Sequence, residues 1–332
     1  ALISAGDEVL NVAGVDIVTA SDTSVNANIG GDLAGFTAEI EFDVVDNAAG
    51  LIAEMGGADV AGHLTEANSI TVDDTQTGSV VNANDGAILA GFTADVGFDV
   101  VDDADAIALE VAGASNSGDE LNSVDANGVI NTVVVSGGDV DATEAGVIQS
   151  ISGYVGTASD YDITDTATAL ISAGDEVLNV AGVDIVTASD TSVNANIGGD
   201  LAGFTAEIEF DVVDNADAIA IEVAASGTGA GSLDEANNVA VVSGDVTASE
   251  ADAIQSISGY VGTASDYEIT DDAAAVITAG NSVIQDNGVT KVNVTDVANA
   301  LQGVSLNAYN ANVDFDVSDN VASISSVLLV SQ

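Results

Sequence analysis

Acidic and apolar residues alternate in the segment 38–44, which reads Ala-Glu-Ile-Glu-Phe-Asp-Val. A period of two places the acids on one face of a strand and the apolar side chains on the other. Carboxylate oxygens are the ligands that Ca²⁺ prefers in proteins. Acidic strand faces of this kind therefore predict Ca²⁺ sites, and Ca²⁺ is the one cofactor that we expect. The candidate ligands are Glu39, Glu41, Asp43, Asp99, Glu207, Glu209, Asp211 and Asp316.

The same acids have a second interpretation, as a solvated face that keeps the chain soluble. Strands stacked ~4.8 Å apart would bring acids of neighbouring strands close together, and like charges in that position are unfavourable. An intervening strand between equivalent strands would ease the repulsion, and divalent cations would relieve it further. Both interpretations stay open at this point.

Six further aspartates each end a strand that contains an aromatic residue, and sequence with helical character follows. This position predicts helix N-caps, each worth typically ~1 kcal/mol. We therefore prefer capping to metal binding for Asp46, Asp102, Asp165, Asp214, Asp271 and Asp319.

The charge balance excludes several classes of partner. The chain of 332 residues holds 55 acidic residues and one basic residue, Lys291, and its formal net charge is −54. Binding of nucleic acid or of an anionic lipid surface depends on Lys and Arg and is not expected. So many carboxylates repel one another unless cations screen them. Seawater or a halophile's cytoplasm would supply such cations, but we favour a Ca²⁺-rich extracellular or cell-surface location.

No catalytic arrangement emerges from the sequence, and we do not expect an enzyme. The only histidine, His63, lies in a variable loop, and cysteine is absent. No phosphate-binding glycine motif occurs between a strand and a helix. Without an apolar run of 18 residues, no membrane span is expected either.

Internal repetition organises the chain. Residues 1–48 return unchanged as residues 169–216. Strands with an aromatic residue and a final Asp start at Phe42, Phe98, Tyr161, Phe210, Tyr267 and Phe315. Spacings of about 55 residues are typical of a tandem array. We predict six repeats, at residues 1–57 (starting within the array), 58–117, 118–173, 174–229, 230–280 and 281–332.

Each repeat has an earlier strand, such as 17–21 or 239–244, and helical signals between its two strands. Thr247 and Glu250 form a capping box ahead of apolar residues spaced by three, and Asp141 and Glu144 form another. In the first and fourth repeats, Gly-Gly pairs such as Gly30-Gly31 weaken the helical pattern. The order strand-helix-strand-helix predicts an α/β repeat protein stacked as a solenoid. An array of β-sandwich domains is the alternative.

The segments Val241–Ile254 and Tyr267–Val276, with Tyr161–Leu170 as the best match, resemble repeats of very large secreted bacterial surface proteins of the RTX-like type. The shared layout is a strand, a T-x-x-E-A helix, a second strand and a D-T-A-A-N-hydrophobic segment. The glycine-rich Ca²⁺-binding nonapeptide of RTX proteins is absent. The resemblance implies a secreted adhesin, surface-layer or matrix protein.

We therefore expect an extracellular structural protein that builds a surface layer, fibre or matrix and self-associates with the help of divalent cations. The apolar segment Ser326–Ser331 suggests chain-to-chain contacts, since an exposed strand edge invites pairing. The alternative function is an adhesin stalk or module that binds a ligand or carbohydrate.

Overall fold

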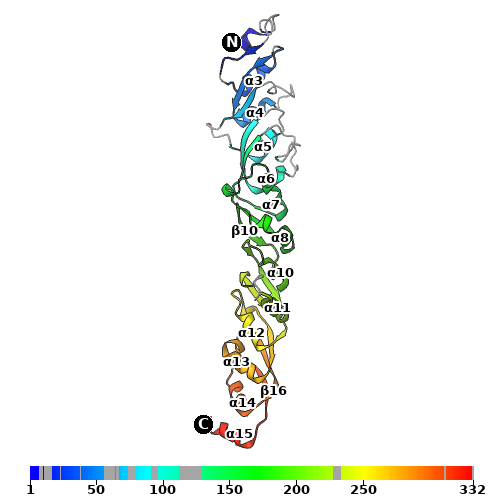
Figure 1. Cartoon of the computed structure of the whole chain (residues 1–332), viewed down its shortest axis with the longest axis vertical. Helices are drawn as coiled ribbons and strands as arrows, with labels where there is room; N and C mark the ends of the chain where they lie inside the picture. The colour runs from blue at the N-terminus through cyan, green and yellow to red at the C-terminus, as the bar shows by residue number, and fades with distance from the viewer. Residues whose placement is uncertain are drawn as a thin grey trace. The chain divides into compact units, whose positions relative to one another are not determined.

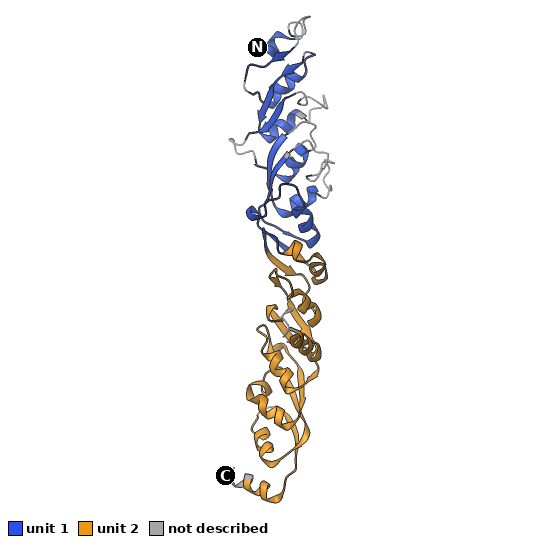
Figure 2. Ribbon diagram, in the orientation of Figure 1, with its two compact units in different colours: residues 1–163, 179–184 blue, residues 164–178, 185–332 orange. Residues whose placement is uncertain are grey.

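The computed structural model describes residues 1–6, 10, 17–22, 24–37, 39–55, 64, 67–73, 80–90, 96–111, 121, 129–226, 233–309 and 312–330 (Figure 1). The chain forms two compact units (Figure 2). Unit 1 comprises Ala1–Ile163 with Asn179–Asp184, and unit 2 comprises Thr164–Leu178 with Ile185–Gln332. The boundary falls inside the predicted repeat 118–173.

Strands and helices alternate through unit 1. Its helices are α1 (Leu2–Ala5), α3 (Ala27–Ala34), α4 (Ala48–Met55), α5 (Ala83–Ala90), α6 (Ala104–Val111), α7 (Ala142–Gln149) and the 3-10 helix η2 (Gly156–Ala158). Its strands are β1 (Val18–Thr19), β2 (Ile40–Glu41), β3 (Asp43–Asp46), β4 (Ser69–Val72), β5 (Val80–Val81), β6 (Val96–Asp102), β7 (Val129–Val135) and β8 (Asp139–Val140). Strands β9 (Tyr161–Asp165) and β10 (Val183–Ala188) have residues in both units.

Unit 2 continues the same alternation. Its helices are α8 (Ala167–Ala173), α9 (Asp175–Leu178), α10 (Ala195–Leu201), α11 (Ala216–Ser226), α12 (Ala248–Gln255), α13 (Ala273–Ile284), α14 (Ala300–Asn307) and α15 (Val321–Val330), with the 3-10 helices η3 (Leu233–Glu235) and η4 (Gly262–Ala264). Its further strands are β11 (Ile208–Glu209), β12 (Asp211–Asp214), β13 (Asn238–Val241), β14 (Asp245–Val246), β15 (Tyr267–Asp271), β16 (Val289–Ala298) and β17 (Val313–Val317).

Every strand pair with a defined register is parallel. Unit 1 holds a sheet in the order β3-β4-β6-β5, with β7 also paired to β6, and unit 2 holds the sheet β14-β15-β16-β17. In unit 2, helices α10 to α15 contact one another in chain order (Figure 1). The protein is thus an α/β protein in which strands and helices alternate, as the sequence predicts, and its strand pairs are parallel. We call one strand with the helix that follows it a coil.

The interior consists of small and branched apolar side chains from both elements. In the segment that opened the sequence analysis, Ile40, Phe42 and Val44 are at most 4% exposed, whereas Glu39 and Glu41 are exposed. The predicted alternation of faces is therefore confirmed. Every α-helix from α3 to α14 except the four-residue α9 starts with an alanine that is at most 8% exposed. The first position of each of these helices is thus buried.

The glycine pair of the first repeat does not weaken its helix as predicted. Helix α3 runs through Gly30 and Gly31, and both are buried. A Cβ atom on Gly30 would lie 2.9 Å from Val44 Cγ2, and one on Gly31 would overlap the side chain of Glu54. The glycines therefore allow the helix to approach its strand and the next helix, and this packing outweighs their low helix propensity.

Both predicted capping boxes are confirmed, at Asp141 with Glu144 and at Thr247 with Glu250. The expectation for the C-terminal segment is wrong in one respect. Residues Ser326 to Val330 belong to helix α15. That stretch therefore presents no strand edge, and the sheet edge in this region is β17.

Candidate functional site

The six strand-end aspartates are not helix N-caps, which corrects the prediction. The N-cap is the residue after each of them: Asn215 follows Asp214, for example, and its Oδ1 accepts the N–H of Ala218 at 3.0 Å. Asp272, which follows Asp271, caps α13 in the same way. The sequence places two polar residues before each of these helices. The spacing of apolar residues in the helix does not show which of the two is the N-cap.

Instead, five of these aspartates bridge consecutive coils. One carboxylate oxygen of Asp214 accepts the N–H of Asn215 at 2.7 Å, and the other accepts the N–H of Ala195, the first residue of α10, at 3.0 Å. We call such a contact an aspartate bridge. The same bridge joins Asp46 to Ala27, Asp102 to Ala83, Asp271 to Ala248, and Asp319 to Ala300, at 2.9 to 3.1 Å.

Other coils satisfy the first helical N–H differently. Asp190 accepts the N–H of Ala167, and Asp296 accepts that of Ala273, both at 2.7 Å. At Ala104 the acceptor is the carbonyl oxygen of Gly137, at 2.9 Å. In each case the next coil supplies the acceptor, so a helix terminus that would otherwise hold unpaired donors is completed by its neighbour.

At Asp319 the bridge favours the charged form of the carboxyl group. Hydrogen bonds from the N–H groups of Ala300 and Asn320 hold the pKa of Asp319 below its usual value. The partial positive charge of a helix N-terminus acts in the same direction. Ionised Asp319 is therefore the form that joins its two coils.

Several predicted Ca²⁺ ligands on the sheet face accept hydrogen bonds from neutral side chains of the adjacent strand. Asp43 accepts from Ser69 Oγ at 2.7 Å, and Asp99 accepts from Thr132 Oγ1 at 2.6 Å. The same pairing joins Asn238 Nδ2 to Asp211 at 2.8 Å and Thr19 Oγ1 to Glu41 at 3.4 Å. Alternation of acids with neutral donors removes much of the expected like-charge repulsion between neighbouring strands.

In two strand pairs, acidic residues lie directly beside each other. Asp139 of β8 pairs with Asp162 of β9, and Asp245 of β14 pairs with Glu268 of β15. Glu268 also lies beside Lys291 in the register of β15 and β16. Lys291 Nζ forms an ion pair with Asp314 at 3.0 Å, which raises the pKa of the lysine. The single cation of the chain thus lies between two acidic strands.

The remaining predicted ligands, Glu39, Glu207, Glu209 and Asp316, are exposed. Within the described part of the chain, no three His, Cys, Asp or Glu side chains converge as a metal site. The structure therefore places four of the predicted ligands next to neutral donors and leaves the other four exposed, and it does not assemble them around a common point. Binding of Ca²⁺ stays a prediction.

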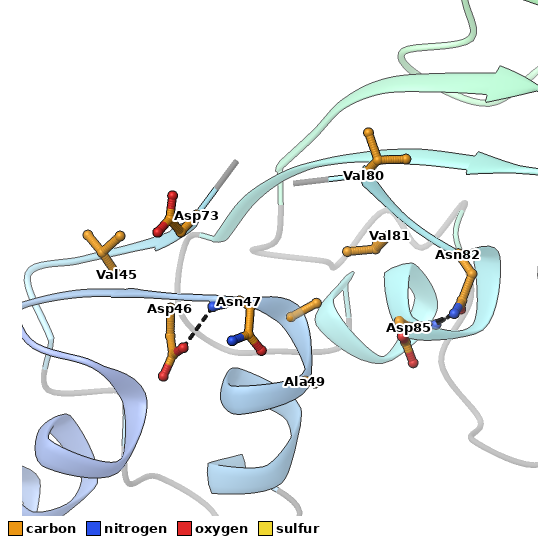
Figure 3. A pocket seen from close by; sticks show the side chains of 10 residues that line it. Val45, Asp46, Asn47, Ala49, Asp73, Val80, Val81, Asn82 and Asp85 are labelled. Carbon is orange, nitrogen blue, oxygen red and sulfur yellow. Dashed lines mark hydrogen bonds between the residues drawn. The ribbon is translucent and has the colours of Figure 1, made fainter. Parts of the chain in front are cut away.

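A cavity of about 600 Å³ in unit 1 lies beside the start of α4 and α5 (Figure 3). Carboxylates of Asp46, Asp73 and Asp85 and the amides of Asn47 and Asn82 line it. These groups already serve the helix termini: Asp46 bridges to Ala27, and Asn82 Oδ1 accepts the N–H of Asp85 at 2.8 Å. The described lining of the cavity thus presents carboxylates and amides.

Two tyrosine clusters, around the buried Tyr161 and Tyr267, were not predicted from the sequence. Tyr267 accepts a hydrogen bond from Gln255 Nε2 at 2.8 Å, and Tyr260 donates to Asp286 Oδ1 at 2.6 Å. Burial raises the pKa of both hydroxyl groups, so they stay neutral. Tyr161 and Gln149 repeat the first contact. The exact recurrence of residues 148–161 as 254–267 was the available signal. His63 lies outside the described residues.

No protein-family model matches the chain, and no curated protein matches it. Among the described residues, no helix is long and apolar enough to cross a membrane.

Proposed function

We propose that this protein is an extracellular structural protein whose coils stack as a solenoid, and that it self-associates into a surface layer, fibre or matrix. The observation that supports this proposal is the aspartate bridge. In each bridge, one carboxylate accepts the first helical N–H of one coil and the N–H of the residue just before the next helix. A contact of this kind joins neighbours along an array and has no role in a reaction.

The charge supports a setting rich in cations. Acceptors outnumber donors on the sheet faces, and Lys291 is the one basic side chain available to pair with them. Divalent cations are the partners that we propose for the exposed carboxylates. They would screen the repulsion between chains that each carry −54 and so permit assembly.

The adhesin alternative needs exposed aromatic side chains for stacking on a carbohydrate. In the described part of the chain, no aromatic side chain is fully exposed: Phe42, Phe98, Phe210, Tyr161 and Tyr267 are at most 4% exposed, and Phe36, Tyr154, Phe204, Tyr260, Tyr309 and Phe315 are partly exposed. The structural role is therefore the better supported of the two.

Light scattering and electron microscopy in CaCl₂, in NaCl of equal ionic strength and in EDTA test the proposal. We expect polymers in CaCl₂. A monomer under all three conditions would refute the self-association, and polymers of equal size in CaCl₂ and NaCl would show that general screening replaces a specific role of Ca²⁺.

A further inference from the structure

The chain contains one tyrosine cluster twice, with the same sequence and one chemical difference. Residues 148–161 recur unchanged as 254–267. Tyr161 and Tyr267 each accept a hydrogen bond from a glutamine amide at 2.8 Å. Their backbone N–H groups each donate to the carbonyl oxygen of a glycine, in both cases at 3.0 Å. One cluster lies in each unit, and the two share the same backbone frame.

The difference is the acceptor of the other tyrosine in each cluster. The hydroxyl of Tyr154 donates to the carbonyl oxygen of Ala181 at 3.0 Å, whereas that of Tyr260 donates to Oδ1 of Asp286 at 2.6 Å. Val180 takes the place of Asp286 in the first cluster. The backbone carbonyl oxygens of Val180 and Asp286 accept equivalent N–H groups, both at 3.1 Å. The side chain at this one position therefore decides what each hydroxyl meets.

Asp286 is a base held in place beside a phenol. The distance of 2.6 Å is typical of a hydrogen bond from a hydroxyl to a charged carboxylate. The N–H of Gly288 donates to the same Oδ1 at 2.8 Å and fixes the carboxylate. Burial and the hydrogen bond to Asp286 raise the pKa of Tyr260, so the resting phenol keeps its proton. The carbonyl oxygen of Ala181 cannot take up a proton in the same way, because an amide is a very weak base.

Oxidation by one electron is the chemistry that this pair suits. A phenol that loses an electron becomes a strong acid, and its hydroxyl proton must then leave. At Tyr260 the proton moves along an existing hydrogen bond to Asp286, whereas at Tyr154 it must reach the solvent. Tyr260 is partly exposed, so its electron can pass to an oxidant at the surface.

The remaining tyrosines lack one or both of these features. Tyr161 and Tyr267 are only 1% exposed, and their hydroxyl groups accept hydrogen bonds from glutamine. Tyr309 donates to the carbonyl oxygen of Ile277 at 3.3 Å. Tyr260 thus combines partial exposure with a carboxylate acceptor.

We propose that Tyr260 is the preferred site of one-electron oxidation in this protein and that Asp286 is its proton acceptor. The oxidant takes one electron from the phenol, the O–H bond of Tyr260 breaks, and its proton forms an O–H bond with Asp286. The products are a neutral tyrosyl radical, protonated Asp286 and the reduced oxidant. The net charge of −54 favours the approach of a cationic oxidant. This site is independent of the proposed structural function.

Flash photolysis of tris(bipyridyl)ruthenium, with a cobalt(III) ammine as the quencher, supplies a cationic one-electron oxidant. Transient absorption measures the rate of tyrosyl radical formation, and mass spectrometry locates the oxidised residue. We expect a fast phase in the unaltered chain that Tyr260→Phe removes.

Asp286→Asn tests the proton acceptor. An asparagine oxygen can still accept the hydrogen bonds of Tyr260 and Gly288, so the geometry is retained while the base is lost. We expect the fast phase to disappear, and the remaining rate to rise with the concentration of buffer base. Asp266→Asn is the matched control, because it removes one exposed carboxylate close to the same cluster and should keep the fast phase.

The first cluster offers the reverse test. Val180 is partly exposed, so a carboxylate is tolerated there. Val180→Asp should give Tyr154 the acceptor that Tyr260 has, and add a second fast phase that Tyr154→Phe removes. Circular dichroism shows whether the variant is folded.

Three results would overturn the proposal. The first is an unchanged fast phase in Asp286→Asn, and the second is oxidation of Tyr154 as fast as that of Tyr260 in the unaltered chain. The third is a folded Val180→Asp variant without a second fast phase. If Val180→Asp does not fold, the comparison of Asp286→Asn with Asp266→Asn decides alone.

Discussion

Replacement of Asp214 by asparagine sets two electrostatic effects against each other. With a net charge of −54, removal of any carboxylate reduces repulsion and should raise the free energy of unfolding. Removal of an aspartate bridge should lower it. The sign of the change therefore decides whether the bridge holds the coils together.

The contacts of Asp214 set the magnitude. Its carboxylate accepts the N–H of Ala195 at 3.0 Å, and the N–H and Nδ2 of Asn215 at 2.7 and 2.9 Å. Ala195 is fully buried, so its N–H has no access to water once the acceptor is lost. Hydrogen bonds to charged groups contribute about 1.5–3 kcal/mol, and a buried unpaired donor costs about 1–3 kcal/mol. Asparagine retains one acceptor oxygen, so we expect a loss of about 2 kcal/mol, and about 3 kcal/mol for Asp214→Ala.

Trypsin supplies the assay, because Lys291 is the only Lys or Arg in the chain. Lys291 lies in β16, between β15 and β17 of the same unit, so cleavage requires this sheet to open. Loss of about 2 kcal/mol should speed cleavage about 30-fold where opening precedes it. Urea unfolding followed by circular dichroism gives the free energy independently.

Asp200→Asn is the matched control, since Asp200 is exposed on α10 and its replacement removes one charge from the same unit. We expect trypsin to cleave Asp200→Asn at the rate of the unaltered chain or slightly more slowly. Equal cleavage rates and equal urea midpoints for Asp214→Asn and Asp200→Asn would refute the bridge as a source of stability.

Three further predictions concern single sites. Gly30→Ala should lower the free energy of unfolding by about 1–3 kcal/mol, because its Cβ would lie 2.9 Å from Val44 Cγ2. Gly35→Ala is the control, because a Cβ there meets only ordinary contacts. Equal urea midpoints for the two variants would contradict this prediction. Glu110 is 4% exposed and its Oε2 has no hydrogen-bond partner. Glu110→Met should therefore raise the free energy of unfolding by about 1–3 kcal/mol. A lower urea midpoint for this variant would contradict the prediction and show that the carboxylate stabilises the fold. The pKa of Asp319 is lowered in the folded protein. Its contribution to the free energy of unfolding should therefore be complete above pH ~4 and decline as the pH falls through the pKa that Asp319 has in the folded state. An NMR titration midpoint of Asp319 at or above ~3.9 would contradict this prediction.

Local patterns were sufficient to predict the elements. The alternation in 38–44, the capping boxes at Asp141 and Thr247, and the α/β class all follow from short-range periodicity and capping chemistry. The glycine helix α3 was judged weaker than it is, because a propensity scale does not include the close approach of Val44 and Glu54. The role of the strand-end aspartates was also misassigned, because their second hydrogen-bond partner lies 19 or 23 residues earlier.

The absence of proline also has an explanation in the fold. Proline is common at the first position of a helix, where its missing N–H usually costs nothing. Here that N–H donates to the next coil, as Ala195 does to Asp214. Strands paired on both sides leave few other places for a residue without an N–H.

The sequence by itself determined the internal repetition, the alternation of strands and helices, the buried face of the segment 38–44 and the excess of negative charge. Each of these depends on residues close together in the chain or on composition. Only the tertiary structure decided which carboxylate meets which donor. Asp214 reaches Ala195, and Asp43 meets Ser69 across a parallel register, because stacking of coils sets these distances. It also distinguished identical residues in β1 and β10, whose burial depends on their neighbours and not on their sequence.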